Sequence, residues 1–425
     1  MSNRWKGLVV LVGVLLYGWS LQPARGWTAN AKESASEQQD WPAVIMKLRE
    51  QLSATPNFVA TRKQLAVAYN NYGVTLAGQG KLDEAIRQLE QAQQLDAANA
   101  QFRENLVRVY LQAAQVVYQQ HRFEEMRQLI DRALALDARS AQAYLLLGEL
   151  EYNSQRLPQA KAAWEQALKL DPSLKIAQER LQRVSKELPV ESKFEKLSQA
   201  YFDIRYTENL ERATGFDVRD VLLQARRSVG SDFAYWPQQK TIVLVYSAEQ
   251  FRALRQETPD WVAGQYDGKI RVPLPGKGLD LQAVTRTLVH EYTHAVIHDL
   301  VHDRLPTWFN EGLAEYEGWK GSAPAWAVLR QNAKAGTVLP WKDLKDAFST
   351  SLPANVVMLG YEESHSIIRY LVERYGFWRI RQVLKAVDAG TPLETVLETE
   401  LHTKRTRLEA EWLKWVNESL LKGSR

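Results

Sequence analysis

From Trp41 to Leu188 the apolar positions recur about every 3.6 residues, as on one face of a helix, and the pattern repeats itself along the chain. Three copies align, of which the middle one is the most divergent. Small residues at shared positions let two helices pack closely, and larger ones stack neighbouring units. The equivalent positions are Gly73, Ala85, Leu89, Ala92 and Ala97; Ala114, Met126, Ile130, Ala133 and Ala138; and Gly148, Ala160, Trp164, Ala167 and Pro172.

The last two copies are 34 residues apart, a spacing that resembles tetratricopeptide repeats. The first two are 41 apart, so the joining helices are expected to be longer there. The pattern predicts an α-solenoid of about three repeats over residues 41–188, with a capping helix at Trp41–Leu52. Two roles are open for it: a groove that binds a protein partner, or a rigid spacer that also builds oligomers.

Beyond Pro189 the helical repeat gives way to mixed strands and helices, which predicts an α+β domain over residues 194–421. Glycines followed by Pro273 predict a turn into an edge strand. A helix from about Leu281 to His302 should follow directly after the sheet. The other predicted elements are strands Tyr201–Thr207, Lys240–Ser247 and Lys269–Leu274, and helices Asp217–Phe233 and Ala248–Glu257.

Residues 1–31 have the pattern of an export signal. A basic head precedes the apolar run Gly7–Leu21, and the small residues Ala29-Asn30-Ala31 fit a cleavage site. The run is short for a membrane span, which needs about 20 residues, so a cleaved signal is favoured over an uncleaved anchor. The polar composition of residues 32–40 predicts a linker. We therefore expect an exported protein, periplasmic or secreted, that touches a membrane only if this segment is retained.

Charge and composition exclude some partners and ligands. The net charge is +4 and the basic residues are scattered, so no electrostatic footprint for nucleic acid is evident. The chain has no cysteine, which rules out disulfides and thiolate ligands to zinc. Any metal site must therefore use His, Glu or Asp.

Four of the seven histidines recur every fourth residue, at 290, 294, 298 and 302. Residues four apart on a helix are separated by roughly 6 Å along its axis, so His290 and His294 can hold one ion between them. His298 would lie roughly 12 Å from His290 along the axis, too far for the same ion. With Glu291 the pair forms His-Glu-x-x-His, in which the glutamate serves a zinc-bound water as base. His298 and His302 are interpreted as bystanders.

A third ligand is expected on a second helix, in the segment Leu305–Trp319. Pro306 favours a helix start, and Glu311 and Glu315 lie one turn apart. We assign Glu311 as the third ligand and Glu315 as a carboxylate that orients a histidine ring, although the two roles could be exchanged. Two histidines and one glutamate leave a position open for water, as in catalytic zinc sites.

The paired motifs "HEYTH" and "WFNEGLAEY" resemble those of gluzincin metallopeptidases, including thermolysin-like enzymes. His294 and Glu311 are separated by 16 residues, so the chain is most similar to compact peptidase MA-like domains, which often accompany tetratricopeptide repeats. "GYEESHSIIRYLVERYG", Gly360–Gly376, looks like their downstream helix. The likeness covers roughly Phe194–Leu420 and implies a zincin-like fold with one zinc ion.

This resemblance implies roles for individual residues. His290, His294 and Glu311 match the ligands, with Asn310 next to them in the Asn-Glu pair, and Glu291 matches the general base. Tyr361 is similar in placement to the tyrosine that gluzincins direct at the tetrahedral intermediate. His365, one turn further on, is the competing candidate, and each of the two could instead be a buried polar residue of the core.

The sequence thus predicts an exported zinc metallopeptidase whose repeats recruit a substrate or partner. The edge strand near Lys269–Leu274 would let a peptide substrate lie extended beside it. There is no Gly-x-Met-Glu-Asn element of the kind that aminopeptidases use to capture a free N-terminus, so an endopeptidase is favoured. The alternative is a tetratricopeptide adaptor whose peptidase-like domain binds zinc but is inactive.

Overall fold

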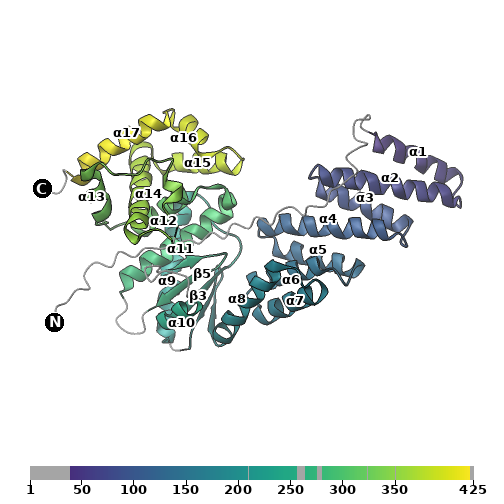
Figure 1. Cartoon of the computed structure of the whole chain (residues 1–425), viewed down its shortest axis with the longest axis horizontal. Coiled ribbons are helices and arrows are strands. Elements are labelled where there is room, and N and C mark those ends of the chain that lie inside the picture. Colours follow the sequence, from purple (N-terminus) through teal and green to yellow (C-terminus); the bar gives the residue numbers. More distant parts are fainter. Residues whose placement is uncertain are drawn as a thin grey trace. The chain divides into compact units, whose positions relative to one another are not determined.

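Figure 1 shows the computed structural model, which describes residues 39–208, 210–255, 264–274, 280–322, 324–349 and 351–421. The chain divides into two compact units, one that ends at Leu188 and one that begins at Pro189. The predicted export segment lies outside the described residues. Within the described ranges no helix has both the length and the apolar character that a membrane crossing requires.

The first unit is helical and consists of three helix pairs, α2 with α3, α4 with α5 and α6 with α7, flanked by α1 and α8. Helix α4 has seven more residues than α6, which accounts for the wider spacing of the first two copies and confirms the predicted lengthening. The helices are α1 (Trp41–Ala54), α2 (Val59–Gly78), α3 (Leu82–Leu95), α4 (Ala100–Gln119), α5 (Phe123–Leu136), α6 (Ala141–Asn153), α7 (Leu157–Leu170) and α8 (Lys175–Glu191).

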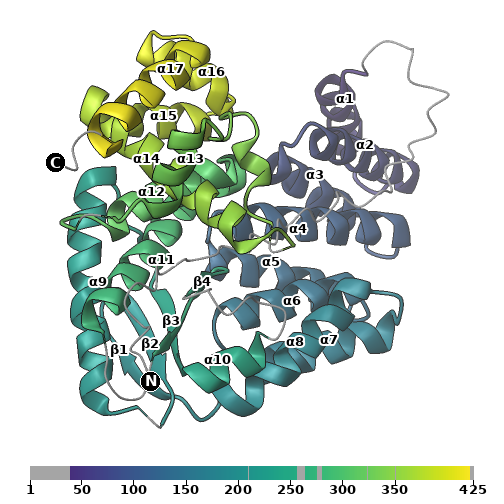
Figure 2. The ribbon, with the colours of Figure 1, turned by 60° about the vertical axis from the view of Figure 1, so that its left-hand side comes forward.

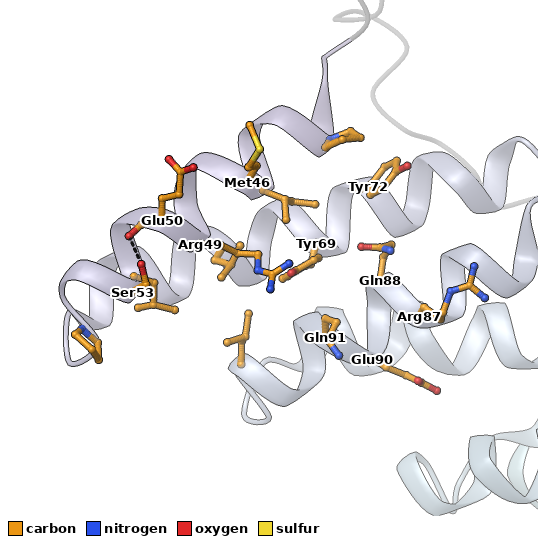
Figure 3. Close-up of a pocket in the computed structure, with 16 residues that line it drawn as sticks. Met46, Arg49, Glu50, Ser53, Tyr69, Tyr72, Arg87, Gln88, Glu90 and Gln91 are labelled. Atoms are coloured by element: carbon orange, nitrogen blue, oxygen red, sulfur yellow. Dashed lines mark hydrogen bonds between the residues drawn. The ribbon is translucent and has the colours of Figure 1, made fainter.

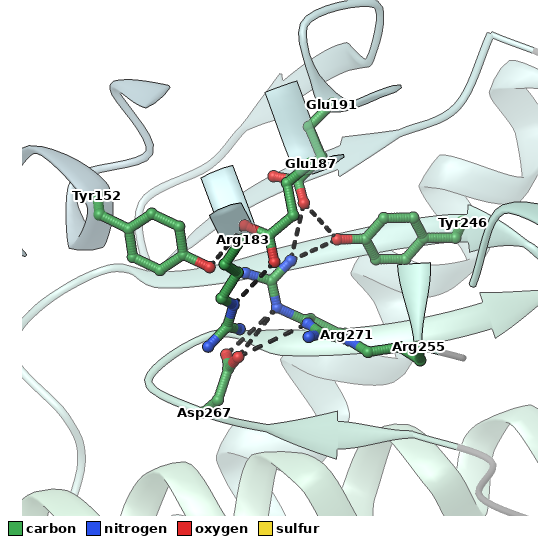
Figure 4. A network of polar contacts seen from close by, with 8 residues as sticks. All are labelled: Tyr152, Arg183, Glu187, Glu191, Tyr246, Arg255, Asp267 and Arg271. Carbon is green, nitrogen blue, oxygen red and sulfur yellow. Dashed lines mark hydrogen bonds and ion pairs between the residues drawn. The ribbon is translucent and has the colours of Figure 1, made fainter. Parts of the chain in front are cut away.

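Close packing within a pair depends on the small residues that the repeats share. A Cβ atom on Gly148 of α6 would overlap the indole of Trp164 on α7, which is fully buried. The indole Nε1 of Trp164 donates to the carbonyl oxygen of Leu145 at 3.2 Å, so its polar atom is satisfied inside the core. Helix α8 ends the unit with Glu187, whose carboxylate accepts hydrogen bonds from Tyr152 and Arg183 (Figure 4).

The second unit contains a five-stranded mixed sheet with the order β1-β2-β3-β5-β4. The three inner strands are parallel, and the two outer strands pair antiparallel with their neighbours. Parallel strands need a long crossover connection, which helix α9 provides between β2 and β3. The strands are β1 (Glu195–Ser198), β2 (Phe202–Tyr206), β3 (Thr241–Ser247), β4 (Gln265–Tyr266) and β5 (Ile270–Leu274).

Successive residues of β3 face opposite sides of the sheet, which gives the unit two apolar layers. Val243 and Val245 pack in the large core that includes residues of α9 and α11, whereas Leu244 and Tyr246 pack with Phe251 of α10 (Figure 2). The remaining helices surround the α11 side. The helices of this unit are α9 (Arg212–Phe233), α10 (Ala248–Leu254), α11 (Leu281–Val301), α12 (Thr307–Gly318), α13 (Ala327–Ala335), α14 (Ala354–Tyr375), α15 (Phe377–Asp388), α16 (Leu393–Leu401) and α17 (Arg405–Trp415), with short 3₁₀ or π turns at His302–Arg304, Leu344–Asp346 and Val416–Leu421.

The prediction of an α-solenoid followed by an α+β domain is confirmed. One detail is wrong: the strand predicted as the edge is β5, and β4 pairs with its first two residues, Ile270 and Arg271. The sequence analysis missed β4 because only two residues form it, between Gly264 and the turn at Gly268. It also missed β1, whose mostly exposed residues give no apolar alternation.

Two glycines in comparable helices test the packing of the solenoid. Gly148→Ala should lower the free energy of unfolding by about 1 to 3 kcal/mol, because the new methyl group forces Trp164 out of its position. The matched change Gly78→Ala, in α2, meets no atom within 4 Å and should leave stability unchanged or slightly raised. Urea unfolding of the full chain, followed by circular dichroism, measures both. Equal effects of the two changes would contradict this account of the packing.

Candidate metal centre

Helix α11 carries the histidine motif through the middle of the second unit. Asp280 caps its first turn, since the side chain accepts hydrogen bonds from the backbone amides of Gln282 and Ala283 at 3.0 Å. His290 and His294 follow in the buried part of the helix, with 2% and 1% of their surfaces exposed. The helical spacing thus places both rings on one face, away from water.

Helix α12 supplies the glutamate. It packs against α14 as well as α11, and Gly312 permits the close approach, because a Cβ atom there would lie 2.6 Å from the backbone oxygen of Ser364. Glu311 precedes this glycine and is 1% exposed. Its carboxylate is therefore held against the histidines of α11 from the opposite helix.

Three ligand atoms converge. His290 Nε2 and His294 Nε2 are 2.8 Å apart, and a Glu311 carboxylate oxygen lies 3.4 Å from the first and 3.5 Å from the second. Ligands bound tetrahedrally to zinc at 2.0 to 2.2 Å would be separated by about 3.3 Å. Among the residues that the structure describes, these three form the one group of such side chains that could hold a metal ion.

The other ring nitrogens fix the orientation of both imidazoles. His294 Nδ1 donates to the side-chain oxygen of Asn310 at 3.0 Å, and His290 Nδ1 donates to Glu315 at 3.1 Å. Each Nε2 atom then carries a lone pair, and both lone pairs point at the same place as the Glu311 oxygen. Three lone pairs this close repel one another unless a cation lies between them, so the site fits a metal ion.

The pKa values of His290 and Glu311 also indicate that the site favours positive charge at its centre. Burial lowers the pKa of His290, but hydrogen bonds to Glu311 and Glu315 outweigh it and raise the pKa to about 10. Burial likewise raises the pKa of Glu311, and the neighbouring His294 and His290 turn the net shift downward. Without metal, a proton on His290 therefore takes the place that a cation would fill.

Glu291 follows His290 in α11 and lies next to this group, and its carboxyl has no hydrogen-bond partner in the described part of the chain. Its carboxylate is fully buried, and within the described residues neither oxygen accepts or donates a hydrogen bond. Burial raises its pKa well above the usual value, and the charge of Glu311 adds to the rise. A buried carboxyl that no protein group satisfies is rare and indicates a functional position.

Tyr361 and His365 come from α14, one turn apart, and both are buried. Burial raises the pKa of Tyr361 well above its usual value, and the charges of Glu311, Glu315 and Glu291 raise it further. His365 packs on Trp326, with ring centroids 4.6 Å apart, and burial lowers its pKa to about 3. The choice between them stays a prediction.

The structure agrees with the interpretation of the later histidines as bystanders. His298 pairs with Asp303 at 3.3 Å, and its ring lies 6.4 Å from that of His302. Neither belongs to the metal-binding group found among the described residues.

Sequence reasoning did not identify Trp319, whose Nε1 donates to Glu315 at 2.8 Å and steadies the carboxylate that orients His290. Its position one turn after Glu315 was the available signal.

Comparisons with known proteins agree with the two-part organisation. Residues 258–418 match the Peptidase MA superfamily, and residues 66–99 and 141–174 match the tetratricopeptide repeat. These matches support a chain in which tetratricopeptide repeats precede a domain similar to that superfamily. The matched range includes His290, Glu311 and the other candidate residues of the site. No curated protein matches the chain.

Several solved structures resemble part of the chain. The Arabidopsis OM64 TPR domain is 22% identical with a TM-score of 0.24, and the match covers 30% of this chain and 98% of that one. The first TPR of Spaghetti (RPAP3) bound to an HSP90 peptide is 26% identical with a TM-score of 0.24, over 30% and 95%. The crystal structure of MamA is 22% identical with a TM-score of 0.24, over 35% and 80%.

The groups that orient the rings should control metal affinity. Asn310→Ala and Glu315→Ala should each weaken zinc binding about 10- to 100-fold, because a ring loses its fixed tautomer and orientation. The matched change His298→Ala should leave affinity unchanged. Competition with a chromogenic chelator measures all three. Unaltered affinity in both Asn310→Ala and Glu315→Ala would contradict the assigned hydrogen bonds.

Proposed function

We propose that the chain is an exported zinc-dependent metallopeptidase, and more specifically an endopeptidase. The observation that carries the proposal is the convergence of His290, His294 and Glu311 on one point, beside the Glu291 carboxyl, which no described residue hydrogen-bonds. A structural zinc site has no need of such a carboxyl, whereas hydrolysis requires a base next to the metal-bound water. The match to the Peptidase MA superfamily supports the same reaction class.

A zinc ion held by the three ligands would polarise the scissile carbonyl and lower the pKa of a bound water. Glu291 would take a proton from that water as it attacks, and would then deliver the proton to the departing amine. Its buried position suits both steps, since a carboxyl with a raised pKa is a better base and holds the proton until the amine accepts it. Tyr361, or else His365, would donate a hydrogen bond to the oxyanion.

An extended substrate would pair with the sheet beside α11. Within the described residues the last part of β5, from Val272 to Leu274, has β3 on one side and no strand on the other. Its backbone groups there could receive a substrate strand next to the short β4. The sequence lacks the Gly-x-Met-Glu-Asn element that aminopeptidases use to capture a free N-terminus, so cleavage within a chain is favoured.

The repeats would recruit a substrate or partner through a groove at their first end. It has a volume of about 1260 Å³, lies between α1 and α3, and is lined by apolar residues such as Ile45 and Tyr69. Figure 3 shows Arg49 pointing into it, whereas the carboxylates of Glu50 and Glu90 point away. Within the described residues Arg49 has no ion pair, so the groove favours a peptide with an acidic side chain among apolar ones.

The alternative hypothesis is that the protein is an adaptor with an inactive peptidase-like domain. Both readings predict zinc and a bound partner, so neither binding assay separates them. They differ in the need for Glu291, because an adaptor has no use for a base in the water-excluded part of the site. The adaptor reading therefore gains weight only if a folded, zinc-loaded chain cuts nothing.

Glu291→Gln should keep one zinc per chain and lower peptide cleavage at least about 100-fold, because the amide cannot act as a base. The experiment incubates the zinc-loaded protein, without residues 1–40, with a mixed peptide library and reads the new termini by mass spectrometry. Internal cuts that require Glu291 support an endopeptidase. Cuts that persist in Glu291→Gln would refute the mechanism, and loss of single terminal residues would refute the endopeptidase assignment.

Arg49→Glu should weaken the binding of acidic, apolar peptides at least about tenfold, because it reverses the charge in the groove. Arg62→Glu is the matched control, since Arg62 is an exposed residue of α2 outside the groove. Fluorescence anisotropy with labelled acidic and basic ten-residue peptides measures both variants. A preference for the basic peptides in the unmodified protein, or equal losses in the two variants, would contradict the assigned occupant.

A further inference from the structure

The backbone of Gly264 lies against the carboxyl of Glu291. A Cβ atom at position 264 would be 2.7 Å from a Glu291 carboxylate oxygen and 3.1 Å from Glu291 Cγ. Its φ angle is outside the left-handed region, so the backbone itself would accept an alanine. A glycine is therefore required at 264 for steric reasons, because the Glu291 side chain, proposed as the base, occupies the volume that a Cβ atom would need.

The strand pair that carries Gly264 has little freedom to move away. Gln265 and Tyr266 follow the glycine directly and pair with Arg271 and Ile270 of β5. Arg271 is fully buried, and its guanidinium pairs with Glu191 at 2.8 Å. Because an unpaired buried charge is costly, this ion pair fixes the strand in place.

The turn between β4 and β5 is tied to the same network. Asp267 accepts from Arg271 Nε at 3.3 Å and lies 3.7 Å from Arg255 (Figure 4). The phenol of Tyr246 donates to Glu191 at 2.6 Å and completes the cluster. The backbone around Gly264 is thus anchored on the sheet face away from α11.

Thr287, one turn before Glu291, also limits the volume next to Gly264. Its methyl carbon would be 2.9 Å from the same Cβ atom. The hydroxyl donates to the carbonyl oxygen of Ala283 at 3.2 Å, and a β-branched side chain in a helix has few rotamers, so this methyl cannot turn aside. Of the surrounding groups, only the end of the Glu291 side chain can swing away.

We infer that Gly264 is a positioning residue for Glu291. The missing side chain at 264 leaves the space that the Glu291 carboxyl occupies beside the proposed metal ligands, and any side chain there would displace the carboxyl. The catalytic consequence rests on the proposed function, whereas the steric relation does not. Gly264 immediately precedes β4, 27 residues before Glu291, and belongs to neither paired motif.

The steric relation is tested without activity, by a double-mutant cycle in the full chain. Gly264→Ala should lower the urea midpoint in the unmodified background and change it less than half as much in the Glu291→Ala background, which has room for the methyl group. Gly78→Ala should behave alike in both backgrounds. If Gly264→Ala fails to fold alone, recovery of folding in the double variant supports the inference. Equal shifts in both backgrounds would overturn it.

The catalytic consequence is tested by kinetics on a peptide identified in the library. Gly264→Ala should lower kcat about 10- to 100-fold and change KM less than about twofold, with one zinc retained per chain. Thr287→Ser removes the second obstacle, so the double variant Gly264→Ala with Thr287→Ser should recover part of kcat. Unchanged kcat would overturn the positioning role. If the unmodified protein cuts no peptide, the proposed function fails, and the stability cycle still decides the steric relation.

Discussion

The second unit depends on one constraint: ligand atoms of three buried side chains converge on a single point that positive charge must occupy. His290 and His294 reach that point from α11 and Glu311 reaches it from α12. In a medium of low polarity such an arrangement is unfavourable unless positive charge occupies the centre. A metal ion would therefore replace the proton that His290 holds at the centre in its absence.

The surroundings of the site maintain this convergence through hydrogen bonds. Asn310 and Glu315 each hold one Nδ1 atom, so each ring keeps its Nε2 atom directed at the centre. Trp319 in turn holds Glu315. The chain of contacts runs along α12, so one short helix supplies a ligand and both orienting groups. Loss of orienting groups of this kind commonly lowers metal affinity about 10- to 100-fold.

The Glu291 side chain is positioned by packing, whereas His290 and His294 are positioned by hydrogen bonds. Its oxygens have no partner among the described residues, so no hydrogen bond competes for the proton that a base must receive. The walls come from α11 itself and from the backbone at Gly264. A network on the opposite face of the sheet, centred on Arg271 and Glu191, holds that backbone. The position of the proposed base thus depends on contacts made on both faces of the sheet.

The sequence by itself determined whatever depends on spacing along one element. The repeat period indicated the solenoid, and the four-residue spacing paired His290 with His294. Pro306 and the one-turn spacing of Glu311 and Glu315 indicated a second helix. Local periodicity suffices there because a helix fixes the relative placement of its own residues.

Only the tertiary structure decided what depends on distant segments. It separated the positions of Glu311 and Glu315, which the sequence left exchangeable, because the approach of α12 to α11 sets which carboxylate meets the Nε2 atoms. It also moved the sheet edge to β4 and brought Gly264 against Glu291. No periodic signal encodes such contacts, since they arise from how two elements pack and not from either element alone.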